Sequence, residues 1–182
     1  MTKRVFIAIN LPGELKKKLN SVIQQLKKIN PDYGINWVAP ENLHLTVHFF
    51  GDLNDKQIAQ AEEGIEEVTK RINSFEIKIA KFGCFPNEEH PKVIFIGVKD
   101  CETIRLLIGQ LEVMLQNLGF LVDPRPWQAH LTLGRIKDNI KCKTTDIDFP
   151  SETFEVKNIE LMESQLKPEG PIYSVIKSFP LK

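Results

Sequence analysis

Two short stretches of the chain are nearly identical. His44-Leu45-Thr46-Val47 lies in the first half of the 182 residues, and His130-Leu131-Thr132-Leu133 lies in the second half. The whole chain has only four histidines, so an internal repeat explains this recurrence better than chance does. A repeat of this kind predicts a pseudo-symmetric fold of two similar halves, each with one copy of the motif in an equivalent position.

Each motif has the alternation expected of a β-strand. In the first copy, Leu45, Val47 and Phe49 are expected on the core side, which turns His44 and Thr46 together to the opposite side. The second copy has the same pattern, so its histidine and threonine also share a face. If an approximate twofold axis relates the halves, the two strands line opposite walls of one cleft, with two imidazoles and two hydroxyls around a small volume.

The rest of the sequence alternates between helix and strand patterns. Three amphipathic helices are expected: one from Leu15, one capped by Asn54 or Asp55, and one capped by Asp100 and ending at Gly119. Strands are expected at 5–9, 43–50, 75–79, 93–98 and 131–136, as one long bulged strand over 154–166, and at 173–179.

Strand groups therefore interleave with helices, and the strands include both fully buried and alternating types. This mixture favours an α+β fold with mainly antiparallel sheets, helices on the outside and a central cleft, over a doubly wound parallel sheet. No linker rich in Pro, Gly or Ser divides the chain. Residues 1–182 are thus expected to form one domain of two lobes, each containing one motif.

Charge and cysteine usage limit the partners and the compartment. Twenty-four basic residues balance 24 acidic ones, so a nucleic acid partner should be held locally, at a terminus or a short strand, and not along a duplex. Cys84, Cys101 and Cys142 have no C-x-x-C spacing and are expected to be free thiols in a reducing compartment. No apolar stretch approaches the length of a membrane span. The sequence predicts a cytoplasmic monomer with no membrane partner.

Two histidine–threonine pairs around one cleft suit phosphodiester chemistry. Imidazole has an ordinary pKa of about 6.5, so one ring can accept a proton from water while the other protonates a leaving oxygen. Threonine hydroxyls can donate to the non-bridging phosphate oxygens. No cluster of Asp and Glu accompanies the motifs, so a two-metal mechanism lacks its ligands, and neither a metal nor another cofactor is expected.

Two other interpretations of the motifs stay open at this point. Each His-x-Thr could be a strand with a satisfied polar face. Alternatively, His44 and His130 could bind zinc with a third ligand from His48 or His90, although no characteristic ligand spacing is present. His48 shares the face of His44 if the strand is regular. The duplication in opposite halves, with matching apolar partners, favours the catalytic interpretation.

The sequence resembles the 2H phosphoesterase superfamily, which is defined by two His-x-Thr/Ser-x motifs, and within it the RNA 2′,3′-cyclic phosphodiesterases once described as 2′-5′ RNA ligases. The similar segments are 4–9, 37–51, the Gly-x-Phe-Pro turn at 82–86, 130–135, and a closing segment over 163–173. The resemblance implies a two-lobed α+β fold. It also implies metal-independent hydrolysis of a terminal 2′,3′-cyclic phosphate to a 2′-phosphomonoester.

The resemblance also implies roles for individual residues. In that family the first-motif histidine is the proton donor and the second-motif histidine the acceptor, which assigns His44 and His130 respectively. Thr46 and Thr132 are expected to bind substrate. Arg135 is a further candidate because a guanidinium can bind phosphate bidentately, but strict alternation turns it away from the cleft unless Gly134 marks a bulge.

Four aromatic residues are candidates for stacking on a nucleobase, although aromatic side chains are more often part of a core. They are Trp37, Phe85, Trp127 and Tyr173. The expected substrate is RNA with a cyclic phosphate end, tRNA fragments included. The alternatives are a 2H phosphodiesterase for small cyclic nucleotides or 2′-5′ oligonucleotides, and a non-catalytic module that binds RNA ends.

Overall fold

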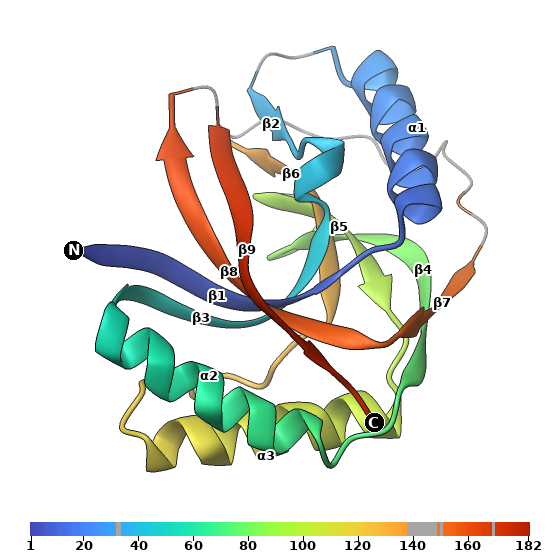
Figure 1. Ribbon diagram of the computed structural model, residues 1–182. Coiled ribbons are helices and arrows are strands. Elements are labelled where there is room, and N and C mark those ends of the chain that lie inside the picture. Colours follow the sequence, from blue (N-terminus) through green and yellow to red (C-terminus); the bar gives the residue numbers. More distant parts are fainter. Residues whose placement is uncertain (32–33, 138–148, 150, 169) are drawn as a thin grey trace.

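The computed structural model describes residues 1–182 except 32–33, 138–148, 150 and 169 (Figure 1). Its elements, in chain order, are β1 (Thr2–Asn10), α1 (Gly13–Ile29), β2 (Ile35–Trp37), the 3₁₀ helix η1 (Pro40–Asn42), β3 (His44–Asn54), α2 (Asp55–Thr69), β4 (Phe75–Phe85), β5 (Val93–Val98), α3 (Glu102–Asn117), β6 (His130–Ile136), β7 (Glu152–Val156), β8 (Asn158–Lys167) and β9 (Gly170–Pro180).

The strands form two sheets, and each sheet contains one of the repeated motifs. The first has the order β3-β1-β8-β9 and the second the order β2-β6-β5-β4-β7. All neighbouring strands in both sheets are antiparallel. The helices lie outside the sheets, with α2 and α3 side by side (Figure 1). The prediction of an α+β fold with mainly antiparallel sheets is therefore confirmed.

One apolar core connects the two sheets. Val5, Ile7 and Ile9 of β1 are almost fully excluded from solvent, and they belong to the same buried cluster as Ile77 of β4 and Ile96 of β5. All three α-helices contribute to this cluster. Helix α1 buries the stripe Leu15, Leu19, Val22, Ile23 and Leu26. Burial of one continuous core fixes how the two motif strands face each other.

The N-termini of α2 and α3 are capped in different ways. At α2, the Asn54 side chain accepts a hydrogen bond from Gln57 N, and the Gln57 side chain accepts one from Asn54 N, both at 3.0 Å. This confirms Asn54 as a cap. The prediction of Asp100 as the cap of α3 is wrong. Cys101 occupies that position, because the Asp100 carboxylate accepts a hydrogen bond from the Arg105 guanidinium at 2.6 Å.

The long strand expected over residues 154–166 is in fact two strands in different sheets. Strand β7 pairs with β4 in the five-stranded sheet, while β8 pairs with β1 in the four-stranded sheet. Lys157 alone separates them. The alternation of buried residues shifts by one at the crossing point, where Lys157 and Asn158 are both exposed. A bulge within one strand produces the same shift, so the pattern did not indicate the change of sheet.

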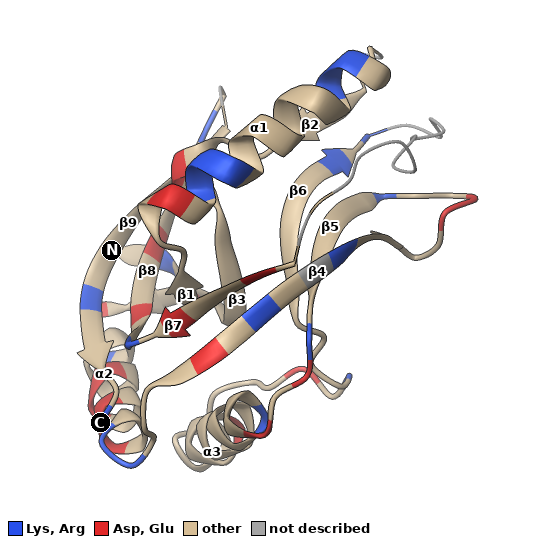
Figure 2. Ribbon diagram, turned by 90° about the vertical axis from the view of Figure 1, so that its right-hand side faces the viewer, with Lys and Arg blue, Asp and Glu red and all other residues tan. Residues whose placement is uncertain are grey.

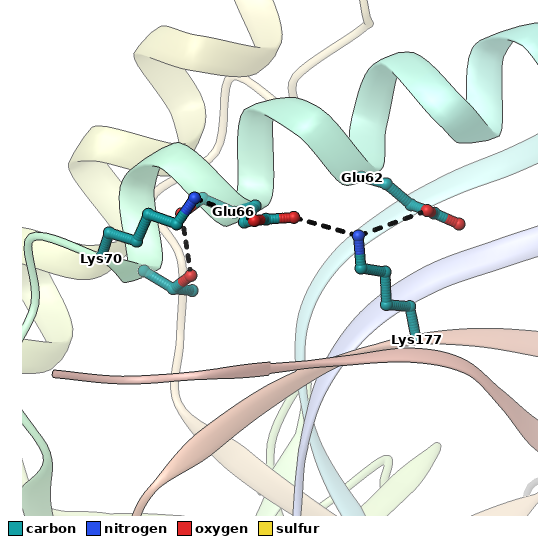
Figure 3. Close-up of polar contacts among 5 residues, drawn as sticks. Glu62, Glu66, Lys70 and Lys177 are labelled. Atoms are coloured by element: carbon teal, nitrogen blue, oxygen red, sulfur yellow. Dashed lines mark hydrogen bonds and ion pairs between the residues drawn. The ribbon is translucent and has the colours of Figure 1, made fainter.

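A cluster of charges links α2 to the last strand (Figure 3). Lys177 Nζ of β9 lies 3.0 Å from Glu66 Oε2 and 3.6 Å from Glu62 Oε2, and Lys70 Nζ lies 2.8 Å from Glu66 Oε1. The hydrogen bonds from Lys70 and Lys177 lower the pKa of Glu66 to about 2. These groups are exposed, so the cluster orients α2 against β9 more than it stabilises the fold.

Basic and acidic residues are interspersed along the elements in Figure 2, in keeping with the formal net charge of zero. Cys84 and Cys101 are free thiols, as expected, and Cys142 lies outside the described residues. None of the described helices is both long and apolar enough to cross a membrane.

Candidate active site

The two motif strands, β3 and β6, lie side by side, and each is hydrogen-bonded to the segment that precedes the other. Val38, which precedes the first motif, donates its N–H to Leu133 O of the second motif at 2.8 Å. Trp127, which precedes the second motif, donates its indole Nε1–H to Thr46 O of the first at 3.1 Å. These reciprocal bonds bring the two motifs together.

Both motif histidines are held in the same tautomer by the backbone. His44 Nδ1 lies 2.7 Å from Asn42 O, and His130 Nδ1 lies 2.8 Å from Gln128 O. A carbonyl oxygen only accepts hydrogen bonds, so Nδ1 is the protonated nitrogen in each ring. Nε2 is therefore the atom that each histidine can use for proton transfer. In the neutral His44 ring, Nε2 accepts a hydrogen bond from the Thr46 hydroxyl at 2.9 Å.

A β-bulge follows the first motif and changes which residues share its face. Thr46 lies opposite Ala8 of β1, and His48 lies opposite Ile7, so Val47 is an extra residue in β3. Thr46 and His48 thus point to opposite faces. The expectation that His48 shares the face of His44 is wrong, because it assumed a regular strand. His48 Nε2 is buried and has no hydrogen-bond partner among the described residues.

The same bulge places Phe49 on the face of the motif. Phe49 lies opposite Phe6 of β1, and the two rings stack with centroids 5.4 Å apart. Its side chain is 47% exposed, so the prediction that Phe49 belongs to the core is wrong. The Arg4 guanidinium carbon lies 5.3 Å from the Phe49 ring centroid. An exposed aromatic ring therefore lies beside the first motif.

A second β-bulge, in β6, changes the face on which Arg135 lies. Thr132 lies opposite Phe95 of β5, whereas Gly134 lies opposite the adjacent Ile94, so β6 has an extra residue between them. Arg135 thus returns to the face of Thr132, and the bulge on which its candidacy depended is present. The guanidinium lies near enough to His44 for its charge to lower the pKa of that histidine.

Gly134 itself lies at a closely packed position. A Cβ atom at this position would lie 3.0 Å from Cε3 of Trp37, whose ring covers the glycine. Of the aromatic residues considered for base stacking, Trp37 is therefore part of the packing around the second motif. The internal repeat could have identified Phe49, because Phe49 and Arg135 each follow their motif histidine by the same spacing.

Two aromatic rings flank each catalytic candidate. The centroid of the His44 ring lies 5.0 Å from that of Phe6 and 5.2 Å from that of Tyr173, and the Tyr173 ring stands nearly perpendicular at 86°. Tyr173 therefore lies beside the first motif, where a residue that binds the substrate would have to lie. Burial raises the pKa of Tyr173, which keeps its hydroxyl protonated and able to donate.

The rings that flank His130 are phenylalanines. Its ring centroid lies 5.1 Å from that of Phe85 and 5.6 Å from that of Phe95, which stack on each other at 4.2 Å. Gly83 makes room for Phe95, because a Cβ there would lie 2.5 Å from Phe95 Cζ. The Gly-x-Phe-Pro turn seen in the sequence supplies both Gly83 and Phe85. Nothing in the sequence indicated Phe95.

The environment of His44 favours its neutral form in the free protein. Burial is the main cause, and it lowers the pKa below the ordinary value of about 6.5. The hydrogen bond to Asn42 O acts in the opposite direction, while the positive charges of Lys16, Arg135 and His130 lower the pKa further. An anion bound among these cations would neutralise their effect and raise the pKa of His44.

We therefore expect the His44 ring to take up its proton only below its ordinary pKa in the free protein, and at higher pH once phosphate is bound. A titration of the histidine side chains by NMR, with and without inorganic phosphate, measures both values. His90, in an exposed loop away from the motifs, is the internal control, and its resonances should not respond to phosphate. A His44 titration that phosphate leaves unchanged would contradict an anion site here.

The described residues contain no group of three or more His, Cys, Asp or Glu side chains that could hold a metal ion. In particular, neither His48 nor His90 joins the motif histidines in such a group, so the zinc interpretation has no third ligand among these residues.

Comparisons with known proteins identify the family to which the chain is similar. The family model described as LigT-like phosphoesterase matches residues 9–95 and 96–173, and each match contains one motif. The RNA 2′,3′-cyclic phosphodiesterase of Methanocaldococcus jannaschii is 35% identical over 97% of this chain and 99% of its own length. The protein of the same name from Archaeoglobus fulgidus is 34% identical, with 97% and 99% coverage.

Solved structures share the fold. The crystal structure of TT0787 of Thermus thermophilus has a TM-score of 0.80 and 26% identity, covering 98% of this chain and 97% of its own. That of Escherichia coli LigT in its apo form has a TM-score of 0.79 and 21% identity, with 100% and 98% coverage. From the match of its sequence to the family model and the paired His-x-Thr motifs at its centre, the chain belongs to the LigT-like 2H phosphoesterase family.

Proposed function

We propose that this protein hydrolyses the 2′,3′-cyclic phosphate at the end of an RNA strand to a 2′-phosphomonoester, without a metal ion. The observation that carries the proposal is the pairing of two histidines, each with Nδ1 bonded to a backbone carbonyl and Nε2 left for chemistry, on adjacent strands from different sheets. Relatives more than 30% identical over nearly the whole chain are named RNA 2′,3′-cyclic phosphodiesterases.

The reaction needs one proton acceptor and one proton donor on opposite sides of the phosphorus. His130 Nε2 accepts a proton from water as the water oxygen attacks, and the bond between phosphorus and O3′ breaks. O3′ takes the proton from His44 Nε2, and the phosphate stays on O2′. Each proton transfer contributes about 10² to 10⁴ in rate. The two rings return to their starting states by exchanging protons with solvent.

The assignment of donor and acceptor follows the family resemblance, and the electrostatics of the site are compatible with it. His44 is neutral in the free protein at pH 7, because burial lowers its pKa. The negative charge of the bound phosphate acts in the opposite direction and raises this pKa, which favours the protonated form of His44 when a substrate is present. A donor that charges on substrate binding is ready at the moment the leaving oxygen needs it.

The remaining site residues hold the phosphate and its nucleoside. Thr46 and Thr132 donate from their hydroxyls to the non-bridging oxygens, and Arg135 balances the charge that develops there. The exposed ring of Phe49 and the ring of Tyr173 form an aromatic surface beside His44, which suits the base of the terminal nucleotide.

We also propose that the whole chain is one domain, in which each lobe supplies one motif. The single apolar core that joins both sheets supports this. That the protein acts as a cytoplasmic monomer stays a prediction.

The direct test uses an oligoribonucleotide that ends in a 2′,3′-cyclic phosphate. The expected product has a 2′-phosphate, and chromatography or NMR separates it from the 3′-phosphate isomer. Activity should persist in EDTA, because the proton transfers need no metal. Loss of activity on chelation, restored by a divalent ion, would contradict the proposal, as would a 3′-phosphate product.

The two alternatives predict activity on other substrates or no activity at all. A phosphodiesterase for small cyclic nucleotides would turn over a 3′,5′-cyclic mononucleotide, and one for 2′-5′ oligonucleotides would cleave an internal 2′-5′ bond. A module that only binds RNA ends would retain the oligonucleotide without forming product. The presence of all four motif residues argues against this last alternative.

A further inference from the structure

A pocket of about 820 Å³ opens beside the paired histidines. Thr46, Phe49 and His130 are among its lining residues, so it is continuous with the candidate active site. The aromatic side chains of Phe85 and Trp127 also line the pocket, as does Lys92. We call this the Trp127 pocket. The reaction itself involves only a cyclic phosphate, a water molecule and the terminal ribose, so this space is left for another part of the substrate.

Hydrogen bonds of its own residues hold the wall formed by residues 122–128. Trp127 Nε1 donates to Thr46 O at 3.1 Å, which fixes the indole against the first motif. Asp123 accepts hydrogen bonds at 3.0 Å from Arg125 N and at 2.9 Å from Arg125 Nε. The hydrogen bonds from Arg125 lower the pKa of Asp123 to about 2, so this pair stays charged at neutral pH. A preformed wall costs little to order when a ligand binds.

The chemistry of the lining fits a nucleoside with one phosphate. Aromatic faces stack on bases of any sequence. Arg125 is engaged with Asp123, and Glu112 also lines the pocket, so the lining does not have the strong positive charge that a run of phosphates would need. Lys92 supplies a cation for a single phosphodiester. The pocket therefore matches one nucleotide unit better than an extended backbone.

Resting on the proposed function, we infer that the Trp127 pocket binds the nucleotide that precedes the cyclic-phosphate nucleotide, so that the substrate is an oligonucleotide end and not a mononucleotide. In the terminal nucleotide, O2′ and O3′ are both bonded to the phosphorus. Its ribose must therefore lie close to the two histidines that act on this phosphorus. The aromatic surface of Phe49 and Tyr173 receives its base, and because Phe49 also lines the Trp127 pocket, the two base positions are neighbours. The pocket on the side of His130 then remains for the next nucleotide along the strand.

The test compares two substrates with the same reactive group: a nucleoside 2′,3′-cyclic monophosphate and a dinucleotide ending in that nucleotide. The protein should have a kcat/KM about tenfold or more higher for the dinucleotide, because stacking contributes about this much per base. Trp127→Leu should reduce the ratio of the two values toward one. Lys92→Gln should reduce it severalfold, through loss of the charge on the phosphodiester.

Lys99→Gln is the matched control. Lys92 and Lys99 flank β5 at its two ends and both are exposed, but Lys99 does not line the pocket. This variant should keep the full preference for the dinucleotide. Thermal unfolding of each variant shows whether it is folded, and Lys92→Gln keeps the test valid if Trp127→Leu does not fold.

The outcomes separate the two proposals. No turnover of either substrate would overturn the proposed function. Equal kcat/KM values for both substrates would overturn the pocket assignment alone. It would also be overturned if both variants slowed mononucleotide and dinucleotide equally, since the pocket would then hold the terminal base.

Binding can be measured without turnover. Trp127 lies in the pocket, and the other tryptophan of the chain, Trp37, packs on Gly134. A dinucleotide with a terminal 2′-phosphate should therefore change the tryptophan fluorescence, whereas a nucleoside 2′-phosphate should not. The same change with both products would contradict a site for the second nucleotide.

Discussion

Replacing either motif histidine with alanine should reduce kcat for a cyclic phosphate end by about 10² to 10⁴-fold, because each substitution removes one of the two proton transfers. His44→Ala removes the donor and His130→Ala the acceptor. The double variant should be little worse than the more damaged single variant, because the two rings act as one unit and their effects are not additive. Single-turnover rates with an RNA substrate measure all three values.

The control for this prediction is His90→Ala, which removes an exposed histidine away from the motifs and should keep full activity. Thermal midpoints should shift by no more than a few degrees in any of these variants, because both motif histidines are partly exposed and neither belongs to the apolar core. Substantial turnover by a folded His44→Ala or His130→Ala variant would rule out the two-histidine mechanism.

The second large effect is expected at Gly83, which does not touch the substrate. Gly83→Ala places a methyl group 2.5 Å from Phe95 Cζ and 2.8 Å from Cε2, so the Phe95 ring must move. That ring contacts both Phe85 and the imidazole of His130, so its movement displaces the imidazole. A displacement of about 1 Å in a catalytic group costs about 10²-fold in rate, and we expect a loss of roughly this size in kcat.

A second substitution distinguishes positioning from general destabilisation. Phe95→Leu shortens the side chain that meets the new methyl group, so the Gly83→Ala/Phe95→Leu variant should recover much of the lost rate. Gly109→Ala is the matched control, because a Cβ there would meet nothing within 4 Å and its helical site favours alanine by about 0.5–1 kcal/mol. Failure of the double variant to recover, with both proteins folded, would contradict a positioning role for Gly83.

The fold class could be predicted from the sequence because alternation and helical stripes are local patterns. The motif strand at 44–50, the buried strand at 5–9 and the helix capped by Asn54 each depend on residues close together in the chain. Sheet membership depends on distant partners. The change of sheet at Lys157 was therefore missed.

The candidate site was predicted in its centre and missed at its edges for a similar reason. His44 shares a face with Thr46, and His130 with Thr132, because a single residue separates the members of each pair, and alternation over so short a distance is reliable. Beyond the threonines, each strand has a bulge that reverses the alternation. This is why Phe49 was assigned to the core and His48 to the motif face.

The two sheets exchange strands in a way that limits how the repeat could have arisen. The sheet with the first motif contains strands from both ends of the chain, and the sheet with the second motif includes β2 from the first half. A single ancestral half would have left several strand edges without partners and its active centre with one imidazole. The two-histidine site therefore needs both halves, because each half supplies one imidazole.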